Sequence, residues 1–213
     1  MPISIRPFKS TDASALQGAV SSSVGHIGPW LDWCTPRYTL KDARAWVNSS
    51  IDHWQQGQAF RWAIVGSNDK HILGGVDIYL PVLGQPVGQM GYWVRRDSVG
   101  RGICTQAAAQ ALHWSFDRLG LARVELFVQP DNAASIAVAL KLGAKLQGQQ
   151  EDQIVFKGKK LPASHYTIQP ENFDHVQLQM AELDQALTIG SKPSEKHQAS
   201  SFEFRRQQKK PRA

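Results

Sequence analysis

The chain has 213 residues, of which 42% are hydrophobic, and a formal charge of +6, so it can form one domain with a sizeable core. It has no run of about 20 apolar residues and no secretory apolar stretch in residues 1–7, which predicts a cytoplasmic protein without a membrane span. Its two cysteines, Cys34 and Cys104, lack the number and the spacing for a disulfide framework or a metal site.

Hydrophobic periodicity predicts a mixture of strands and helices along the chain. Strands are expected near residues 3–6, 60–65, 72–80, 87–94, 122–128, 145–156 and 163–168. Helices are expected near residues 11–22, 40–56, 105–119 and 132–142, and a tryptophan-rich loop separates the first two. Short turns join some strands and helices join others. This order indicates an α/β domain with a mixed, largely antiparallel sheet flanked by helices.

The C-terminal part of the chain differs from the domain expected over residues 1–169. Residues 170–190 carry an apolar stripe that predicts a docked helix, made of Phe173, Val176, Met180, Leu183 and Leu187. Residues 191–213 hold seven Lys or Arg and two Glu, a charge of +5 that leaves +1 for the rest. This segment predicts a disordered basic tail, which can contact RNA or acidic surfaces through charge.

A glycine-rich turn follows the apolar run Met90–Val94 and leads into an alanine-rich helical segment. Gly100 and Gly102 leave backbone N–H groups uncovered at the start of this helix, where the helix dipole favours a phosphate. A dinucleotide fold would require a third glycine where Thr105 stands, and a mononucleotide P-loop would require Gly-Lys-Ser/Thr. The turn therefore predicts a phosphate cradle of another kind.

The cradle resembles the pyrophosphate motif Gln/Arg-x-x-Gly-x-Gly/Ala of the GNAT superfamily, the acyl-coenzyme-A-dependent N-acyltransferases. Asp97 stands at the leading Gln/Arg position, and Arg95 and Arg96 come just before it. Residues 131–144 resemble the later block Asn-x-x-Ser-x-x-x-x-x-Lys-x-Gly-Phe of the superfamily. In this block Asn132 is expected to cap a helix and Gly143 to end it in a left-handed turn.

Two further segments resemble the Rim-type ribosomal-protein N-acetyltransferases. Residues His26-Ile27-Gly28-Pro29-Trp30-Leu31-Asp32-Trp33 are similar to their His-Leu-x-Pro-Trp-Leu-x-Trp, and Gly91-Tyr92-Trp93-Val94 is similar to their Gly-Tyr-Trp-Leu strand. The likeness extends from about Ile3 to Ile168. For the tryptophans, packing in the core is an equal alternative to lining an acceptor pocket.

The resemblance implies acetyl-CoA as co-substrate and a strand at 91–95 that splays from its neighbour after a bulge and offers backbone N–H groups to the thioester. The implied coenzyme-binding residues are Tyr92, Trp93, Val94, Arg95, Arg96, Gly100, Arg101, Gly102, Ile103, Cys104, Thr105, Asn132, Ser135 and Lys141. The implied acceptor-binding residues are His26, Trp30, Trp33 and Asp77. A nucleophilic Cys104 at the helix start is the less favoured alternative to a packed thiol.

The resemblance also suggests catalytic residues. The tyrosine that many superfamily members use to protonate the leaving thiolate is replaced by Ala139, so Ser135, the Rim-type serine, is the candidate acid. The alternative is that the Ser135 hydroxyl only makes a hydrogen bond to the backbone at the start of its own helix.

The glutamate of the Rim pattern aligns with Ile154. Strand alternation places Asp152 on the same side as position 154, which makes Asp152 the first candidate base, and Glu151 the second if a bulge shifts the register. Asp77, His26 and Asp32 could act through water, and for each carboxylate a non-catalytic surface position is the alternative.

The expected activity is acetyl transfer from acetyl-CoA to a primary amine, in first place a protein N-terminal α-amino group of the ribosomal-protein kind. Small-molecule amines, amino acids and antibiotics are alternative acceptors, since a fold alone does not select a substrate. Two other classes are a non-catalytic acyl-CoA-binding module and an RNA- or ribosome-associated protein that acts through its tail. A monomer or a homodimer is expected.

Overall fold

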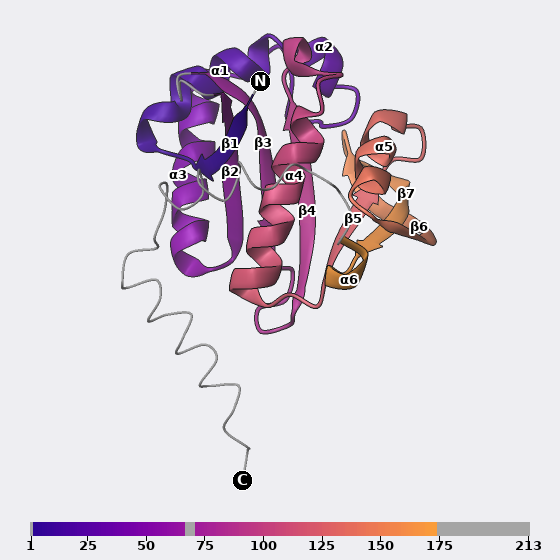
Figure 1. The fold of residues 1–213 in the computed structure, drawn as a ribbon. Helices are drawn as coiled ribbons and strands as arrows, with labels where there is room; N and C mark the ends of the chain where they lie inside the picture. Colours follow the sequence, from indigo (N-terminus) through magenta and orange to yellow (C-terminus); the bar gives the residue numbers. More distant parts are fainter. Residues whose placement is uncertain (1, 67–70, 174–213) are drawn as a thin grey trace.

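The computed structural model describes residues 2–66 and 71–173, coloured in Figure 1. The predicted basic tail and most of the predicted C-terminal helix lie outside the described residues. Among the described residues, the short α6 (Pro170–Phe173) falls within the range predicted for that helix. No helix in the described part of the chain is both long enough and apolar enough to cross a membrane.

An open seven-stranded sheet forms the middle layer, in the order β1-β2-β3-β4-β5-β7-β6 (Figure 1). Neighbouring strands are antiparallel, except β4 and β5, which are parallel. The strands are β1 (Ile3–Pro7), β2 (Ala59–Gly66), β3 (Ile72–Tyr79), β4 (Val87–Val94), β5 (Arg123–Val128), β6 (Lys145–Phe156) and β7 (Lys159–Ile168). The predicted mixed, largely antiparallel sheet is confirmed.

Helices cover both faces of this sheet. They are α1 (Ala13–Ser21), α2 (Val24–Ile27), α3 (Leu40–Gln56), α4 (Ile103–Trp114) and α5 (Ala133–Lys141), with single 3-10 turns at Ser10–Asp12 and Arg96–Ser98 and a π-helical turn at Ser115–Leu119. The predicted helix at 105–119 begins earlier, at Ile103, and its last five residues form the π-helical turn. Helix α2 lies inside the predicted tryptophan loop, because four residues are too short to give a periodic signal.

Alternate strand residues divide the core between the two faces. On one face, Ala63 and Val65 pack with α1 and α3, and on the other, Ile64 and Val76 pack against α4. The buried side of α4 is largely alanine, which lets its axis lie close to the sheet. Its buried Gln110 accepts a hydrogen bond from the Ile5 backbone N–H (3.3 Å) and so satisfies a polar group inside this layer.

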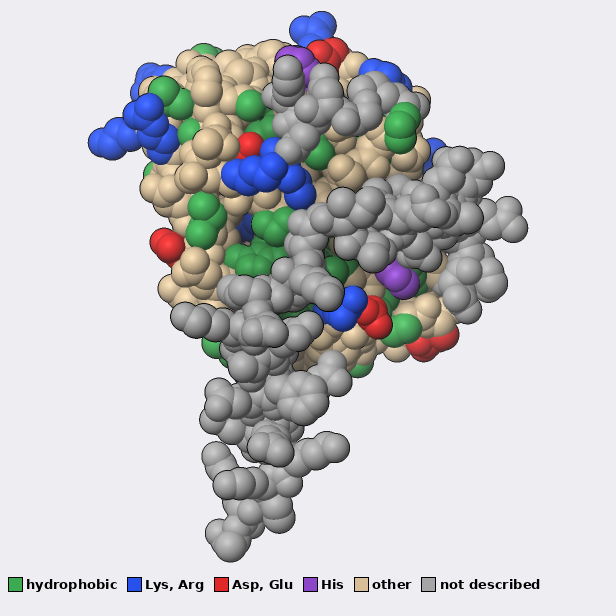
Figure 2. Space-filling view, turned by 60° about the vertical axis from the view of Figure 1, so that its left-hand side comes forward, with side chains coloured by type: hydrophobic (Ala, Val, Ile, Leu, Met, Phe, Trp, Pro, Cys, Tyr) green, Lys and Arg blue, Asp and Glu red, His purple; other side chains and the backbone are tan. Residues whose placement is uncertain are grey.

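An aromatic cluster closes the core between α3 and α4. Its rings, with centroids 4.9–6.4 Å apart, belong to Trp54, Phe60, Trp62 and Trp114. On the face drawn in Figure 2, hydrophobic side chains gather at the centre, beneath a group of Lys and Arg side chains. The ring contacts join the C-terminal ends of α3 and α4 over Phe60 and Trp62 of β2.

Candidate active site

Strands β4 and β5 separate partway along their length. They pair only from Val87↔Arg123 to Gln89↔Glu125, although both strands continue. Beyond this point β4 stays paired with β3 and β5 stays paired with β7. The two strands therefore diverge and leave a gap lined by unpaired backbone groups. The predicted splay is confirmed, but the predicted bulge is wrong, because the register of β4 against β3 has no shift.

The predicted cradle lies at the start of α4. Gly100 and Gly102 both have φ of +72°, a conformation that L-residues with side chains rarely adopt. Gly102 is the N-cap residue, and no side chain caps this end of the helix. The first backbone N–H groups of α4 are thus left for an external acceptor. An anionic pyrophosphate fits both this hydrogen-bonding demand and the positive end of the helix.

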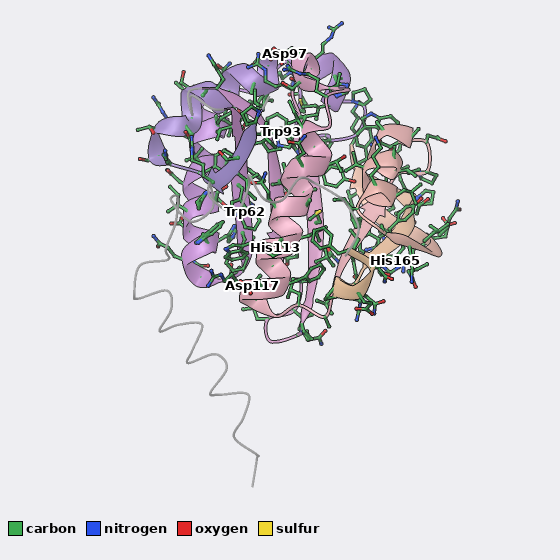
Figure 3. The ribbon with its side chains drawn as sticks, in the orientation of Figure 1. Trp62, Trp93, Asp97, His113, Asp117 and His165 are labelled. Atoms are coloured by element: carbon green, nitrogen blue, oxygen red, sulfur yellow. The ribbon has the colours of Figure 1, made fainter. Side chains whose placement is uncertain are left out.

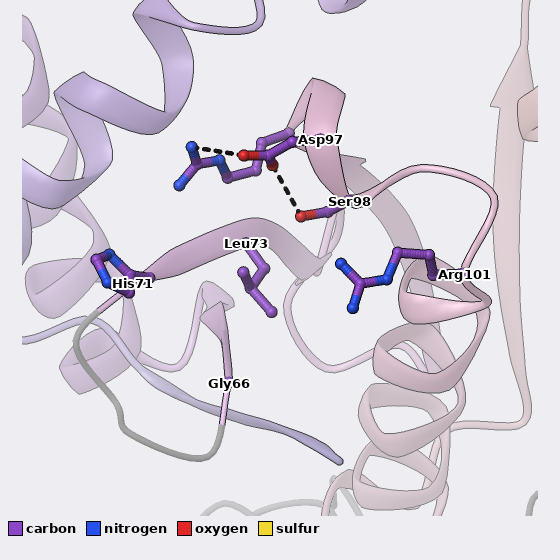
Figure 4. Close-up of a pocket in the computed structure, with 7 residues that line it drawn as sticks. Gly66, His71, Leu73, Asp97, Ser98 and Arg101 are labelled. Atoms are coloured by element: carbon purple, nitrogen blue, oxygen red, sulfur yellow. Dashed lines mark hydrogen bonds and ion pairs between the residues drawn. The ribbon is translucent and has the colours of Figure 1, made fainter. Parts of the chain in front are cut away.

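Both arginines before the cradle make a contact within the protein, Arg95 through its side chain and Arg96 through its backbone. Arg95 pairs with Asp97 (Nη2–Oδ2 2.9 Å), and the backbone N–H of Arg96 donates to Ser23 Oγ (3.1 Å). Arg95 and Asp97 line a cavity of about 400 Å³, together with Gly66, His71, Leu73, Ser98 and Arg101 (Figure 4). Asp97, which stands at the Gln/Arg position of the motif, therefore pairs with the arginine two residues before it.

Ser135 meets a tyrosine from across the gap. Its Oγ donates to the Tyr92 hydroxyl oxygen (3.2 Å), and that hydroxyl donates to the Ser135 carbonyl (3.0 Å). Asn132 caps α5 by accepting from the Ser135 backbone N–H (3.1 Å), which confirms the predicted N-cap. Burial raises the pKa of Tyr92 well above its ordinary value, while the hydrogen bond to Ser135 acts in the opposite direction. Two neutral hydroxyls thus lie together at this end of α5.

Tryptophans gather on the opposite face of β4. Trp33 stacks on Trp46 (centroids 6.4 Å apart) and meets Trp93 edge-on (6.0 Å). Trp33 and Trp46 are 38% and 37% exposed, so they form a partly open wall and not a closed core. The carbonyl of Trp30 accepts from Gln129 Nε2 (3.2 Å), which brings the tryptophan loop over the end of β5. Trp46, on α3, was not predicted, because no local pattern links it to the loop.

Comparison with known proteins identifies this arrangement. The sequence model of the acetyltransferase (GNAT) domain matches residues 3–145. The chain belongs to the GNAT acetyltransferase family. It is an enzyme of this family with acetyl-CoA as its co-substrate.

Relatives and solved structures support this assignment. The chain is 23% identical over 158 residues to the probable N-acetyltransferase YjcK of Bacillus subtilis (strain 168), covering 73% of this chain and 87% of the relative. The structure of Mycobacterium smegmatis RimJ in complex with CoA-disulfide superposes with a TM-score of 0.74 at 22% identity, covering 85% of this chain and 89% of that one. The structure of RimL, the ribosomal L7/L12 α-N-protein acetyltransferase, in complex with coenzyme A superposes with a TM-score of 0.71 at 23% identity. The match covers 78% of this chain and 93% of that one. The fold is therefore that of the Rim-like group.

Cys104, the second residue of α4, is a partly buried thiol. Burial raises its pKa to about 12, so the thiol is neutral at physiological pH. The start of a helix can lower the pKa of a cysteine, but here burial has the larger effect. The structure supports the packed thiol and argues against a nucleophile.

The strand alternation that placed Asp152 on the same side as position 154 does not hold in the structure. Between Gln150↔Ala163 and Ile154↔Leu161, three residues of β6 face one residue of β7, so strand alternation does not hold there. Asp152 has φ of +58°, and its side chain is 64% exposed and lies 3.6 Å from Lys160 Nζ. Glu151 is exposed in the same bulge. A catalytic role for either carboxylate stays a prediction.

The structure does not gather all the predicted residues at one point. His26, on α2, makes no ring contact with the tryptophans within the described residues. Lys141 is exposed at the C-terminal end of α5, whereas Asn132 caps the other end, so the two cannot border the same part of the coenzyme closely. Gly143 has φ of +81°, which confirms the left-handed turn predicted after this helix.

Proposed function

We propose that this GNAT acetyltransferase moves the acetyl group of acetyl-CoA to a protein N-terminal α-amino group, of the kind found on ribosomal proteins. The observation that carries the proposal is the gap between β4 and β5, with hydroxyls on one face of β4 and a partly open tryptophan wall on the other. An acceptor on a large molecule needs such an open approach. RimL, a ribosomal L7/L12 α-N-protein acetyltransferase with the same fold, supports this acceptor class.

The chain's own groups suit the chemistry of acyl transfer. Acetyl-CoA supplies an activated acetyl thioester. The Gly100 and Gly102 turn and the first N–H groups of α4 would bind its pyrophosphate, and unpaired N–H groups of β4 would donate to the thioester oxygen as negative charge develops. Ser135, held in place by Asn132 and Tyr92, would donate its hydroxyl proton to the departing thiolate.

The test measures thiol release from acetyl-CoA with a panel of N-terminal peptides, amino acids, polyamines and aminoglycosides. Release that depends on the peptide acceptor, and acetylation of its α-amine by mass spectrometry, would support the proposal. Release only with small amines would contradict the proposed protein acceptor and indicate a small-molecule acceptor. Coenzyme binding by calorimetry without release from any acceptor would indicate a binding module and contradict the proposed reaction.

Ser135→Ala is expected to lower kcat on the order of 100-fold while the KM for acetyl-CoA changes little, because the hydroxyl acts when the thiolate leaves. The helix cap should survive, since Asn132 bonds the backbone N–H of residue 135, which alanine keeps. Steady-state kinetics and thermal unfolding check both points. Ser135→Thr, which keeps a hydroxyl, should retain more activity than Ser135→Ala. Equal kcat in Ser135→Ala and wild type would remove Ser135 from the mechanism.

A further inference from the structure

Resting on this proposed function, we propose that Asp77 is the general base that takes the proton of the acceptor amine, from the face of the sheet opposite to Ser135. Asp77 lies on β3, in register with Gly91 on β4 and Arg61 on β2. Its side chain borders the strand that carries the thioester-binding N–H groups. The tryptophan wall stands on the same face.

The contact between Asp77 and Gly91 places the carboxylate over β4. A Cβ atom at position 91 would lie 2.8 Å from Asp77 Oδ1, closer than real Cβ contacts allow. The missing side chain at Gly91 is therefore what makes room for the carboxylate there. From Met90 onward β4 has no β5 partner, so the carboxylate lies beside the gap.

Strand alternation separates the two proton-transfer groups. Gly91 and Trp93 face the same side as Asp77, whereas Tyr92 faces the other side, where its hydroxyl meets Ser135. A base on one side of β4 and an acid on the other match an amine that attacks from the side opposite to the leaving thiolate. Trp93 extends this acceptor side, and a Cβ at Gly75 would lie 2.8 Å from its Nε1, so a second glycine makes room for the indole.

Arg61 lowers the pKa of Asp77 through its charge, while its guanidinium contacts residues of α3. The guanidinium of Arg61 lies over the Trp46 ring (4.3 Å to the centroid) and donates to Ser49 Oγ (3.3 Å), which draws it toward α3. Burial raises the pKa of Asp77 to about 6, against the lowering effect of Arg61. The carboxylate is thus ionised at neutral pH and still basic enough to accept a proton.

Other titratable groups face the same region. They are His53 on α3, whose Nδ1 lies 3.2 Å from Ser49 Oγ, Tyr79 on β3, and Glu125, which is in register with Gln89 of β4. Glu125 is tied to Arg123 (2.9 Å) and lies 3.9 Å from His165 Nε2. Asp77 is the carboxylate of this set in register with the unpaired part of β4.

The protons of the proposed reaction balance, with one proton released to solvent in each turnover. Asp77 takes one proton from the ammonium form of the acceptor, and the neutral nitrogen attacks the thioester carbon. As the C–N bond forms and the C–S bond breaks, the nitrogen loses its second proton to solvent, and the thiolate gains one from Ser135. Solvent then takes the proton from Asp77 and restores a proton to Ser135.

The decisive experiment is the pH dependence of kcat/KM with an N-terminal peptide acceptor for wild type, Asp77→Asn and Asp152→Asn. Wild type should show two ascending limbs, one near pH 6 from Asp77 and one near the amine's own pKa of about 7.7–8.0. Asp77→Asn should lose the limb near pH 6 and about 100-fold in kcat, with unchanged coenzyme affinity by calorimetry. Raising the pH to 9 should restore part of the rate, because the amine is then already neutral.

The matched control is Asp117→Asn, an exposed carboxylate at the far end of α4 from Trp93 (Figure 3), which should behave as wild type. Asp77→Asn with the lower limb intact and kcat within twofold of wild type would overturn the inference. Loss of that limb in Asp152→Asn alone would assign the base to Asp152. A wild-type protein that transfers to no acceptor would instead overturn the proposed function.

Thermal unfolding gives a readout that does not depend on turnover. Folding raises the pKa of the Asp77 carboxyl from 3.8 to about 6, so the ionised form lowers the stability of the folded state. This loss of stability is complete above about pH 6 and absent below the unfolded pKa. Asp77→Asn should therefore raise Tm at pH 7.5 by roughly 5 °C, and the gain should vanish toward pH 4. A lower Tm at pH 7.5 would contradict a buried, ionised Asp77.

Discussion

Gly102→Glu is expected to weaken acetyl-CoA binding at least 100-fold and to abolish transfer at coenzyme concentrations that saturate wild type. Two effects add. Position 102 has φ of +72°, where a residue with a side chain costs about 1–2 kcal/mol. A carboxylate there also lies at the positive end of α4 and repels the pyrophosphate that this end would bind. Calorimetric titration with acetyl-CoA measures the loss directly.

Two further variants separate these effects. Gly102→Ala carries the backbone strain alone, because the nearest atom to its Cβ would be Gln106 Nε2 at 3.6 Å, an ordinary contact. Its affinity should fall between those of wild type and Gly102→Glu. Gly18→Glu adds the same charge in α1, where a Cβ meets nothing within 4 Å, and should bind as wild type. Equal affinity of Gly102→Glu and wild type would mean that the coenzyme does not use this turn.

Gly74→Ala is expected to destabilise the domain by roughly 3 kcal/mol or more. Gly74 pairs with Val94 between β3 and β4, in the middle of the sheet. A Cβ there would run into the Trp93 carbonyl oxygen and lie 2.9 Å from Val94 Cα. Both atoms belong to the backbone, so relief requires the two strands to move apart.

Urea unfolding measures this loss, with Gly18→Ala as the control. The control substitutes a helical glycine in open space and should be neutral or stabilising. Since Val94 also ends the strand beside the gap, the folded fraction of Gly74→Ala should show a lower kcat. An unfolding midpoint equal to that of wild type would show that β3 and β4 tolerate the added methyl group.

Local signals were sufficient for most of the fold. The bounds of α3 and β4 agree with the prediction, because apolar residues at helical spacing mark α3 and the apolar run Met90–Val94 marks much of β4. The cradle could be predicted for the same reason, since two glycines and the helix that follows them are adjacent in sequence.

Contacts between distant elements could not be predicted in this way. Tyr92 meets Ser135 only because β4 and α5 face each other across the gap, and Asp77 meets Gly91 only through the register of β3 and β4. The bulge in β6 also has no local signature, so alternation misplaced Asp152. Proton-transfer groups depend on such contacts, which local sequence signals do not contain.

The divergence of β4 and β5 also links the stability of the folded domain to the binding of its coenzyme. The facing edges of the two strands lack each other as hydrogen-bonding partners beyond Gln89 and Glu125, so the empty domain carries a pair of strand edges inside its own sheet. Coenzyme present at 100 times its Kd adds about 2.7 kcal/mol to the folded state. A cell short of acetyl-CoA would leave more molecules open to proteases and to edge-to-edge association. The stability of this domain would then depend on the concentration of its co-substrate.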